Sequence, residues 1–136
     1  MKKLVIEASI DNLDEVLNFV NEDIERHNYP PESINQIYVA VEEIFVNIAS
    51  YAYQADNGSV AIFISAEDCR ISLRFEDSGE PYNPLEQADP DLDKPLMERN
   101  IGGLGVYFVK QLMDKVEYAY VDNKNVLIMT KEIKSA

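Results

Sequence analysis

In the first part of this 136-residue chain, apolar residues recur every three or four positions. After a short strand-like stretch from Leu4 to Ile10, this spacing predicts one amphipathic helix from Asp11 or Asn12 to about His27 and a second from Glu32 to about Gln54. Pro30-Pro31 separates the two helices, because proline interrupts a helix. The apolar stripes are Leu13, Val16, Leu17, Val20 and Ile24 in the first helix and Ile34, Ile37, Val41, Ile44 and Ile48 in the second.

The spacing then changes to that of strands. Val60 to Ser65 is rich in β-forming residues, and Arg70 to Glu76 alternates between apolar and polar side chains. The polar pair Glu67-Asp68 between these two stretches predicts a hairpin. Two more strands are expected at Val116–Val121 and Val126–Thr130, joined by the turn sequence Asp-Asn-Lys-Asn.

A polar connection and a third helix separate the two pairs of strands. The connection runs from Ser78 to Ile101 and holds four of the six prolines, and a helix is expected from Leu104 to Lys115. This order predicts an α/β (α+β) two-layer sandwich, with a mixed, mostly antiparallel sheet covered on one face by three helices. We expect a single domain over residues 1–136. A doubly wound parallel sheet would need strict alternation of strands and helices, which this order lacks.

Composition narrows the classes of partner. Twenty-five acidic against 12 basic residues give a net charge of −13, and there is no basic run, which argues against nucleic acid or an anionic membrane surface as a partner. No apolar run approaches the roughly 20 residues of a membrane span, and the N-terminal residues do not resemble a signal peptide. We therefore expect a cytoplasmic protein. Cys69, the single cysteine, falls in a strand pattern and is expected to be a reduced, half-buried core thiol.

Two polar residues interrupt the second apolar helix. Glu43 and Asn47 are four positions apart, so they lie on one face of the helix. A cavity would explain them, because an Asn carbonyl oxygen is a suitable Mg²⁺ ligand and a carboxylate can act as a base. A solvated stripe on a partly exposed helix would explain them equally well.

Two further motifs have a structural and a functional explanation each. Asp77-Ser-Gly79 can simply begin a turn, or Asp77 can accept a hydrogen bond from an exocyclic amine while Gly79 lets a flat base approach the backbone. Gly102-Gly-Leu-Gly105 can be a hinge, or the backbone amides at a helix start can bind phosphates. The second motif is neither a Rossmann fingerprint nor a Walker A loop.

Taken together and in this order, the motifs resemble those of the bacterial anti-sigma factor serine/threonine kinases. These kinases belong to the ATPase superfamily that includes gyrase, MutL and two-component histidine kinases, with a Bergerat-type ATP-binding fold. Glu43-x-x-x-Asn47 resembles the family's N box, and the stretch from Asp77 to Pro84 resembles its first glycine box. Gly102-Gly-Leu-Gly105 with Leu112-Met-Asp114 resembles the second, and Asn125 to Lys131 resembles the last strand. The resemblance covers nearly the whole chain.

The resemblance implies a role for each matched residue. Glu43 would be the general base, and Asn47 would hold Mg²⁺. Asp77 would bind the adenine amino group, with Gly79 beside the base. Residues 83–101 would form an ATP lid, in which Arg99 would contact the γ-phosphate or a partner. Thr130 would bind near the adenine through water. The phosphates would be bound by Gly102, Gly103, Leu104 and Gly105.

One position departs from the family's pattern. The N box of the family commonly continues with His-Ala-Tyr, whereas this chain has Tyr51-Ala-Tyr53. Contacts near the γ-phosphate that depend on the family's imidazole therefore cannot be assigned to this chain.

These observations lead to a hypothesis and two alternatives. The hypothesis is an ATP- and Mg²⁺-dependent serine/threonine kinase that phosphorylates a small antagonist protein and sequesters a sigma factor, with a homodimer left open. One alternative is an ATP-gated binding module without phosphotransfer. The other is a kinase in a phosphatase-linked partner-switching cascade that does not act on a sigma factor.

Overall fold

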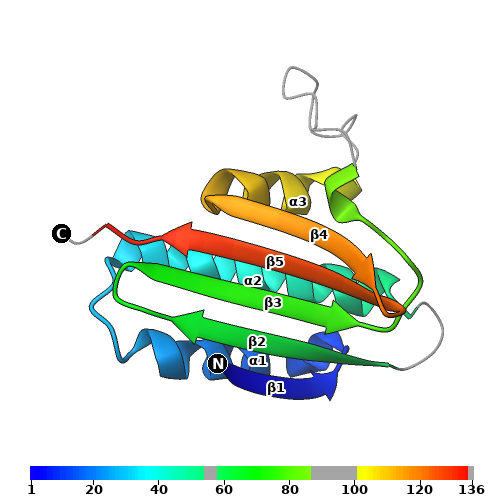
Figure 1. Cartoon of the computed structure of the whole chain (residues 1–136), viewed down its shortest axis with the longest axis horizontal. Helices are drawn as coiled ribbons and strands as arrows, with labels where there is room; N and C mark the ends of the chain where they lie inside the picture. Colours follow the sequence, from blue (N-terminus) through cyan, green and yellow to red (C-terminus); the bar gives the residue numbers. More distant parts are fainter. Residues whose placement is uncertain (54–57, 87–100, 135–136) are drawn as a thin grey trace.

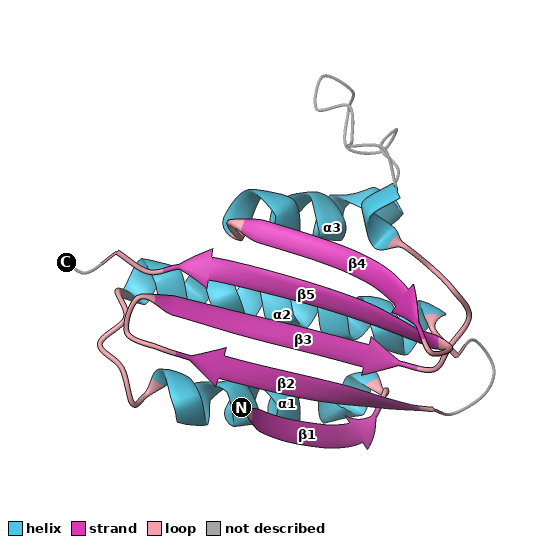
Figure 2. Ribbon diagram, in the orientation of Figure 1, coloured by secondary structure: helices cyan, strands magenta, loops and turns pink. Residues whose placement is uncertain are grey.

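The described residues form one five-stranded sheet and three α-helices (Figures 1 and 2). The computed structural model describes residues 1–53, 58–86 and 101–134, with the backbone alone for residues 86 and 101–104. In chain order the elements are β1 (Lys2–Glu7), the 3-10 turn η1 (Ile10–Asn12), α1 (Leu13–Ile24), α2 (Pro31–Tyr51), β2 (Ser59–Ala66), β3 (Arg70–Asp77), the 3-10 turn η2 (Pro84–Glu86), α3 (Ile101–Leu112), β4 (Lys115–Val121) and β5 (Lys124–Glu132).

The strands lie in the order β1-β2-β3-β5-β4, and all four pairings are antiparallel. Helices α1 and α2 lie behind the sheet in Figure 2, and α3 packs on α2 beside the edge strand β4. The predicted two-layer α/β fold is confirmed. Both predicted hairpins are present, β2–β3 and β4–β5. Among the described helices, none combines the length and apolar character needed to cross a bilayer.

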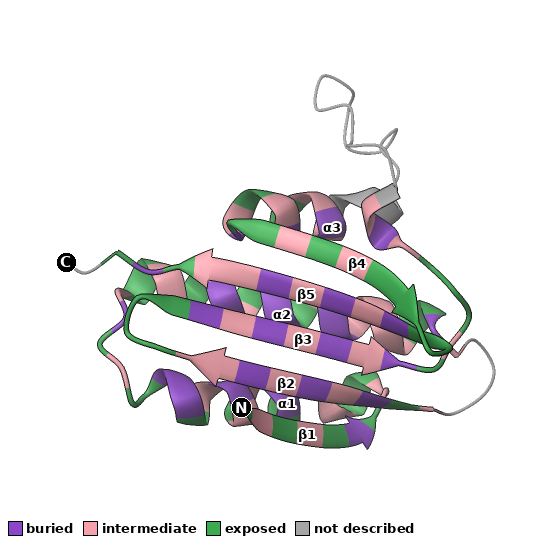
Figure 3. Cartoon of the chain, in the orientation of Figure 1, coloured by how far each residue is buried: buried purple, intermediate pink, exposed green. Residues whose placement is uncertain are grey.

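The core lies between the sheet and the helices, and Figure 3 shows the alternation of buried and partly buried positions along β2, β3 and β5 that builds it. Inward-facing residues of β2 and β3 pack against the buried face of α2. Fully buried members of this core include Ile62, Ile64, Leu73 and Phe75 from the sheet and Ile37, Val41 and Phe45 from α2. The sheet and α2 together form the frame on which the polar residues are held.

Two expected details of the fold are wrong. Helix α3 begins at Ile101 rather than Leu104, so its glycines lie inside the first turns and not before them. Each glycine costs about 1 kcal/mol in a helix, and burial of Val106 and Val109 favours the helix despite this cost. Cys69 is exposed, because it lies in the turn between β2 and β3 rather than within either strand.

The N-terminal cap of the first helix also differs from the expectation. Ser9 caps the preceding 3-10 turn by accepting a hydrogen bond from the backbone N–H of Asp11. Asn12 makes no side-chain cap; its Nδ2 instead donates to the carbonyl oxygen of Glu7, 3.0 Å away. This contact ties the helix entry to the end of β1.

Candidate nucleotide-binding site

Helix α2 brings the first two candidate residues to the mouth of a cavity. Its apolar face is buried against the sheet, and Glu43 and Asn47 occupy half-buried positions beside that face. Burial raises the pKa of the Glu43 carboxyl, and the neighbouring negative charge of Glu42 raises it further. A carboxyl with a raised pKa holds a proton more readily than an ordinary glutamate, which suits a group that must accept one.

Helix α3 brings a glycine directly against this carboxylate. A β-carbon placed on Gly105 would lie 2.3 Å from Oε2 of Glu43, which is closer than side chains pack in proteins. A larger residue at this position would therefore displace the Glu43 carboxylate from its present position next to α3. Glu43 and Gly105, which are far apart in the sequence, line the same cavity of about 270 Å³.

A second cavity adjoins the first and is more apolar. It has a volume of about 40 Å³, and Asp77 lies among its lining residues. Asn47 and Tyr51 line both cavities, so they mark the place where the two meet. The first-described cavity contains Glu43, and the more apolar one contains the buried Asp77 and the exposed Glu80.

Asp77 is buried at the end of β3, with 6% of its surface exposed. Inward positions earlier in β3 hold Leu73 and Phe75, so the strand's buried row ends in a carboxylate. Oδ1 of Asp77 accepts hydrogen bonds from the backbone N–H of Gly79 at 3.0 Å and from Nδ2 of Asn125 at 2.9 Å. Burial raises the pKa of Asp77, and these two hydrogen bonds offset part of the rise.

Gly79 packs against the end of α2. A β-carbon at this position would lie 2.1 Å from the carbonyl oxygen of Ala52, and the next amide, that of Glu80, donates to that same oxygen at 3.1 Å. None of the described glycines has a positive φ. Glycine is therefore needed here for the close contact between the loop and the helix, a reason that the sequence motif did not reveal.

Tyr51 stands where the family's pattern has histidine, and it is more than half exposed. Its ring lies 6.2 Å from that of Tyr82, at an angle of 39°, and both rings line the apolar cavity. Burial raises the pKa of the Tyr82 hydroxyl, and the nearby Tyr51 raises it further. In place of the family's histidine, this chain therefore has Tyr51, whose ring lies close to that of Tyr82.

Asn125 is a site residue that the sequence reasoning missed. Its only earlier mention is as the start of the last strand, yet it is buried, lines the apolar cavity and is the direct cross-strand partner of Asp77. One feature of the sequence could have indicated Asn125. It places a carboxamide at an inward position of β5, in line with the apolar residues Leu127 and Met129 on the same face.

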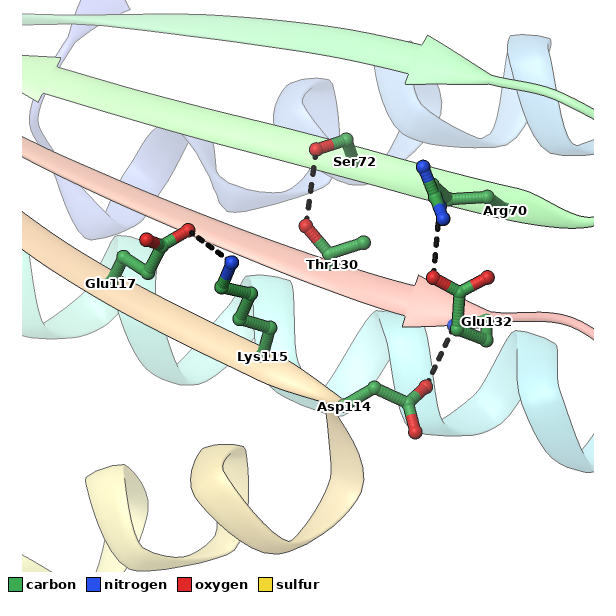
Figure 4. Close-up of polar contacts among 7 residues, drawn as sticks. All are labelled: Arg70, Ser72, Asp114, Lys115, Glu117, Thr130 and Glu132. Carbon is green, nitrogen blue, oxygen red and sulfur yellow. Dashed lines mark hydrogen bonds and ion pairs between the residues drawn. The ribbon is translucent and has the colours of Figure 1, made fainter.

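Thr130 does not lie with the other candidates. It follows the buried Met129 and so faces the side of the sheet away from the helices, where its hydroxyl lies 3.3 Å from that of Ser72 (Figure 4). It lines neither cavity. The strand's alternation of faces excludes the predicted adenine contact in this arrangement.

Several candidates fall wholly or partly outside what the structure describes. Arg99 and most of the predicted lid, residues 87–100, lie outside the described residues. Gly102, Gly103 and Leu104 lie in the first turn of α3, for which the backbone alone is described. Their predicted phosphate contacts stay predictions.

The residues present fit the two groups that the motifs imply. The apolar cavity with a single buried carboxylate suits a heterocyclic base that carries an amino group. Asn47, at the junction, offers a carboxamide oxygen of the kind that Mg²⁺ accepts. The described residues contain no cluster of three or more His, Cys, Asp or Glu suited to a metal. A Mg²⁺ ion here would therefore need oxygens from phosphates and water, as it commonly does at nucleotide sites.

Comparisons with known proteins show what the chain as a whole resembles. The family model described as a histidine kinase-like ATPase domain matches residues 6–131. The chain is 29% identical over 113 residues to the serine-protein kinases RsbW of Bacillus thuringiensis and Bacillus cereus, covering 80% of this chain and 70% of theirs. It resembles the crystal structure of the RsbU and RsbW domains of Rv1364c from Mycobacterium tuberculosis, with a TM-score of 0.63 and 15% identity. The match covers the whole of this chain and 34% of that one.

Proposed function

Because this chain belongs to the histidine kinase-like ATPase family, we propose that it is an ATP- and Mg²⁺-dependent serine/threonine protein kinase of the anti-sigma-factor type. Its substrate would be a small antagonist protein, and its second partner a sigma factor that it sequesters. The observation that carries the proposal is the pair of adjoining cavities, with Asp77 in one, Glu43 in the other and Asn47 at the junction.

Each side chain has one task in this proposal. Asp77 accepts a hydrogen bond from the amino group of adenine, and the apolar walls of its cavity exclude water from the base. Asn47 provides an oxygen ligand for Mg²⁺, which when bound neutralises phosphate charge. Glu43 takes the proton of the substrate hydroxyl, and its raised pKa matches that role. Gly105 keeps the space next to the Glu43 carboxylate free of a side chain.

The catalytic part of the proposal is tested by Glu43→Gln. The variant should bind ATP and Mg²⁺ with unchanged affinity, but it should transfer phosphate about 10²–10⁴-fold more slowly, which is the usual contribution of a general base. Asn47→Ala should instead weaken binding of the Mg²⁺–nucleotide complex itself. The measurements are calorimetry for affinity and transfer of labelled phosphate from ATP to candidate antagonist proteins encoded by neighbouring genes.

Glu42→Gln is the matched control, because it removes the adjacent exposed carboxylate and leaves Glu43 in place. It should transfer phosphate at close to the wild-type rate at neutral pH. A Glu43→Gln variant that is as fast as this control would exclude Glu43 as the base. A folded wild-type protein that gives no heat with ATP and Mg²⁺ would refute nucleotide binding altogether.

The same experiments decide between the kinase and its two alternatives. A wild-type protein that transfers no phosphate, but whose affinity for a candidate partner depends on ATP, would be an ATP-gated binding module. A wild-type protein that phosphorylates an antagonist which controls no sigma factor would act in another partner-switching cascade.

A further inference from the structure

The carboxamide of Asn125 joins Asp77 to the loop that forms the rim of the apolar cavity. Its Nδ2 donates to Oδ1 of Asp77 and to the carbonyl oxygen of Glu80, each at 2.9 Å. Its Oδ1 accepts from the backbone N–H of Tyr82 at 3.0 Å and from the hydroxyl of Tyr118. One side chain thus contacts strand β3, strand β4 and the loop of residues 79–82.

These four contacts use the whole hydrogen-bonding capacity of the side chain. An asparagine offers two N–H donors and two lone pairs on its oxygen, and all four have partners here. A fifth, longer distance of 3.4 Å to the carbonyl of Gly79 shares a donor that is already used. The backbone N–H of Tyr82 can only donate and the carbonyl of Glu80 can only accept, so the orientation of the amide is determined.

The hydrogen bonds also distinguish the two oxygens of Asp77. Both the Asn125 amide and the Gly79 amide donate to Oδ1. Within the described residues, Oδ2 accepts no hydrogen bond, although the Asp77 side chain is buried and lines the cavity. One oxygen is therefore held by the protein, and the other is available to a donor in the cavity.

We propose that Asn125 is the positioning residue of the nucleotide site: it fixes the Asp77 carboxylate and the loop of residues 79–82 so that Oδ2 is presented to the amino group of the base. This role rests on the proposed nucleotide function and deepens it. Asn125 acts through Asp77 rather than on the reacting atoms. No shorter or acceptor-only side chain at this position could make the same contacts. Aspartate could not donate to Asp77 or Glu80, and alanine could make none of the four.

The test compares Asn125→Ala and Asn125→Asp with the wild type and with Ser72→Ala, a control on β3 whose hydroxyl lies on the opposite face of the sheet (Figure 4). The affinity for ADP with Mg²⁺ is measured by calorimetry between about pH 5 and 8. The Asp77 carboxyl is titrated by carbon-13 NMR in the nucleotide-free proteins. Circular dichroism verifies that each variant is folded.

We expect Asn125→Ala to lose at least about tenfold in affinity at pH 7, the scale of one hydrogen bond to a charged group. The pKa of Asp77 should rise above its wild-type value, because a hydrogen bond that favours the carboxylate is gone. The pH above which the protein binds ADP should therefore rise as well. Asn125→Asp should lose more at pH 7, since two adjacent carboxylates repel each other. Ser72→Ala should behave as the wild type.

The positioning role would be refuted by a folded Asn125→Ala variant in which the Asp77 pKa is unchanged or affinity falls equally at every pH. If that variant does not fold, Asn125→Asp provides the test, because the two side chains have nearly the same volume. Binding of ADP by Asn125→Asp with the wild-type affinity would refute the role. A wild-type protein that binds no ADP would instead overturn the proposed function. In that case the Asp77 titration would still test whether Asn125 lowers the pKa of the Asp77 carboxyl.

Discussion

At the scale of single residues, Asp77 places function and stability in opposition. Its carboxyl is buried, and burial raises its pKa above that of an exposed aspartate. Such a group favours folding while it is protonated. That contribution is complete below the pKa of the unfolded state and is lost as the pH rises through the folded pKa. Near neutral pH the ionised carboxylate therefore destabilises the fold, although the proposed nucleotide site requires it.

Asp77→Asn should separate these two effects. The variant should be more stable than the wild type at pH 7, because it keeps a polar group for Gly79 and Asn125 without a buried charge. The difference should vanish at acid pH, where the wild-type carboxyl is also neutral. The same variant should lose about 1–3 kcal/mol of nucleotide affinity. Urea denaturation at several pH values and calorimetry are the measurements; a variant less stable at pH 7 would contradict the account.

Gly79 is a second residue whose effect can be measured. In Gly79→Ala the new β-carbon would meet the carbonyl oxygen of Ala52, a backbone atom that cannot rotate away. The loop or the end of α2 must then shift, and we expect a loss of about 1–3 kcal/mol in the free energy of unfolding. Ser78→Ala, at the neighbouring exposed position, should change the free energy of unfolding by less than about 0.5 kcal/mol. Equal stabilities of the two variants would show that the contact is not tight.

At the scale of elements, the β4–β5 hairpin determines where Asn125 lies. Asp122 and Asn123 in its turn have φ values of 53° and 63°, the left-handed pair that a two-residue type I′ turn requires. The turn sets the register of β4 against β5, and this register places Tyr118 of β4 where its hydroxyl donates to Asn125. The end of α3 is fixed by β5, since Nζ of Lys131 donates to the carbonyl oxygen of Leu112 at 2.8 Å.

Substitutions in this turn should have opposite signs. Asn123→Gly should raise the free energy of unfolding by about 0.4–1 kcal/mol, because glycine adopts a positive φ without strain. Asn123→Val should lower it by at least about 1–2 kcal/mol, because a β-branched residue is strained there. Urea denaturation measures both. Two variants that change stability in the same direction would show that the backbone of the turn is not left-handed in solution.

At the scale of the whole molecule, the net charge of −13 opposes an anionic ligand. Local features must outweigh this repulsion if the chain binds a nucleotide. The described site offers a buried apolar cavity and the carboxamide of Asn47 rather than a cluster of basic side chains. We therefore expect attraction to the base, with Mg²⁺ neutralising phosphate charge, to dominate binding.

This expectation predicts an unusual dependence on salt. Affinity for ATP without Mg²⁺ should increase as ionic strength rises, because salt screens the repulsion between the acidic protein and the phosphates. Affinity for adenosine, which carries no charge, should change little. Calorimetry in about 50 and 500 mM potassium chloride tests both ligands. A steep fall of ATP affinity with salt would instead indicate that basic side chains contact the phosphates directly.

Local patterns in the sequence determined the elements and most of the site's chemical groups. Apolar spacing predicted α1, α2 and four of the strands to within a few residues, because side-chain periodicity follows backbone geometry. The same alternation could also have placed Thr130 on the far face, since it directly follows the buried Met129. The motifs selected Glu43, Asn47 and Asp77, which the fold brings to two adjoining cavities.

Contacts between distant parts of the chain decided the rest. The pairing of Asp77 with Asn125 depends on the register of β3 against β5, and the approach of Gly105 to Glu43 depends on how α3 docks on α2. The contact of Gly79 with Ala52 depends on where α2 ends. Register and docking are set by the packing of the shared core, which no local window of sequence contains. For that reason Glu43, Asn47 and Asp77 could be predicted from the sequence, whereas Asn125, which donates a hydrogen bond to Asp77, appeared only in the tertiary structure.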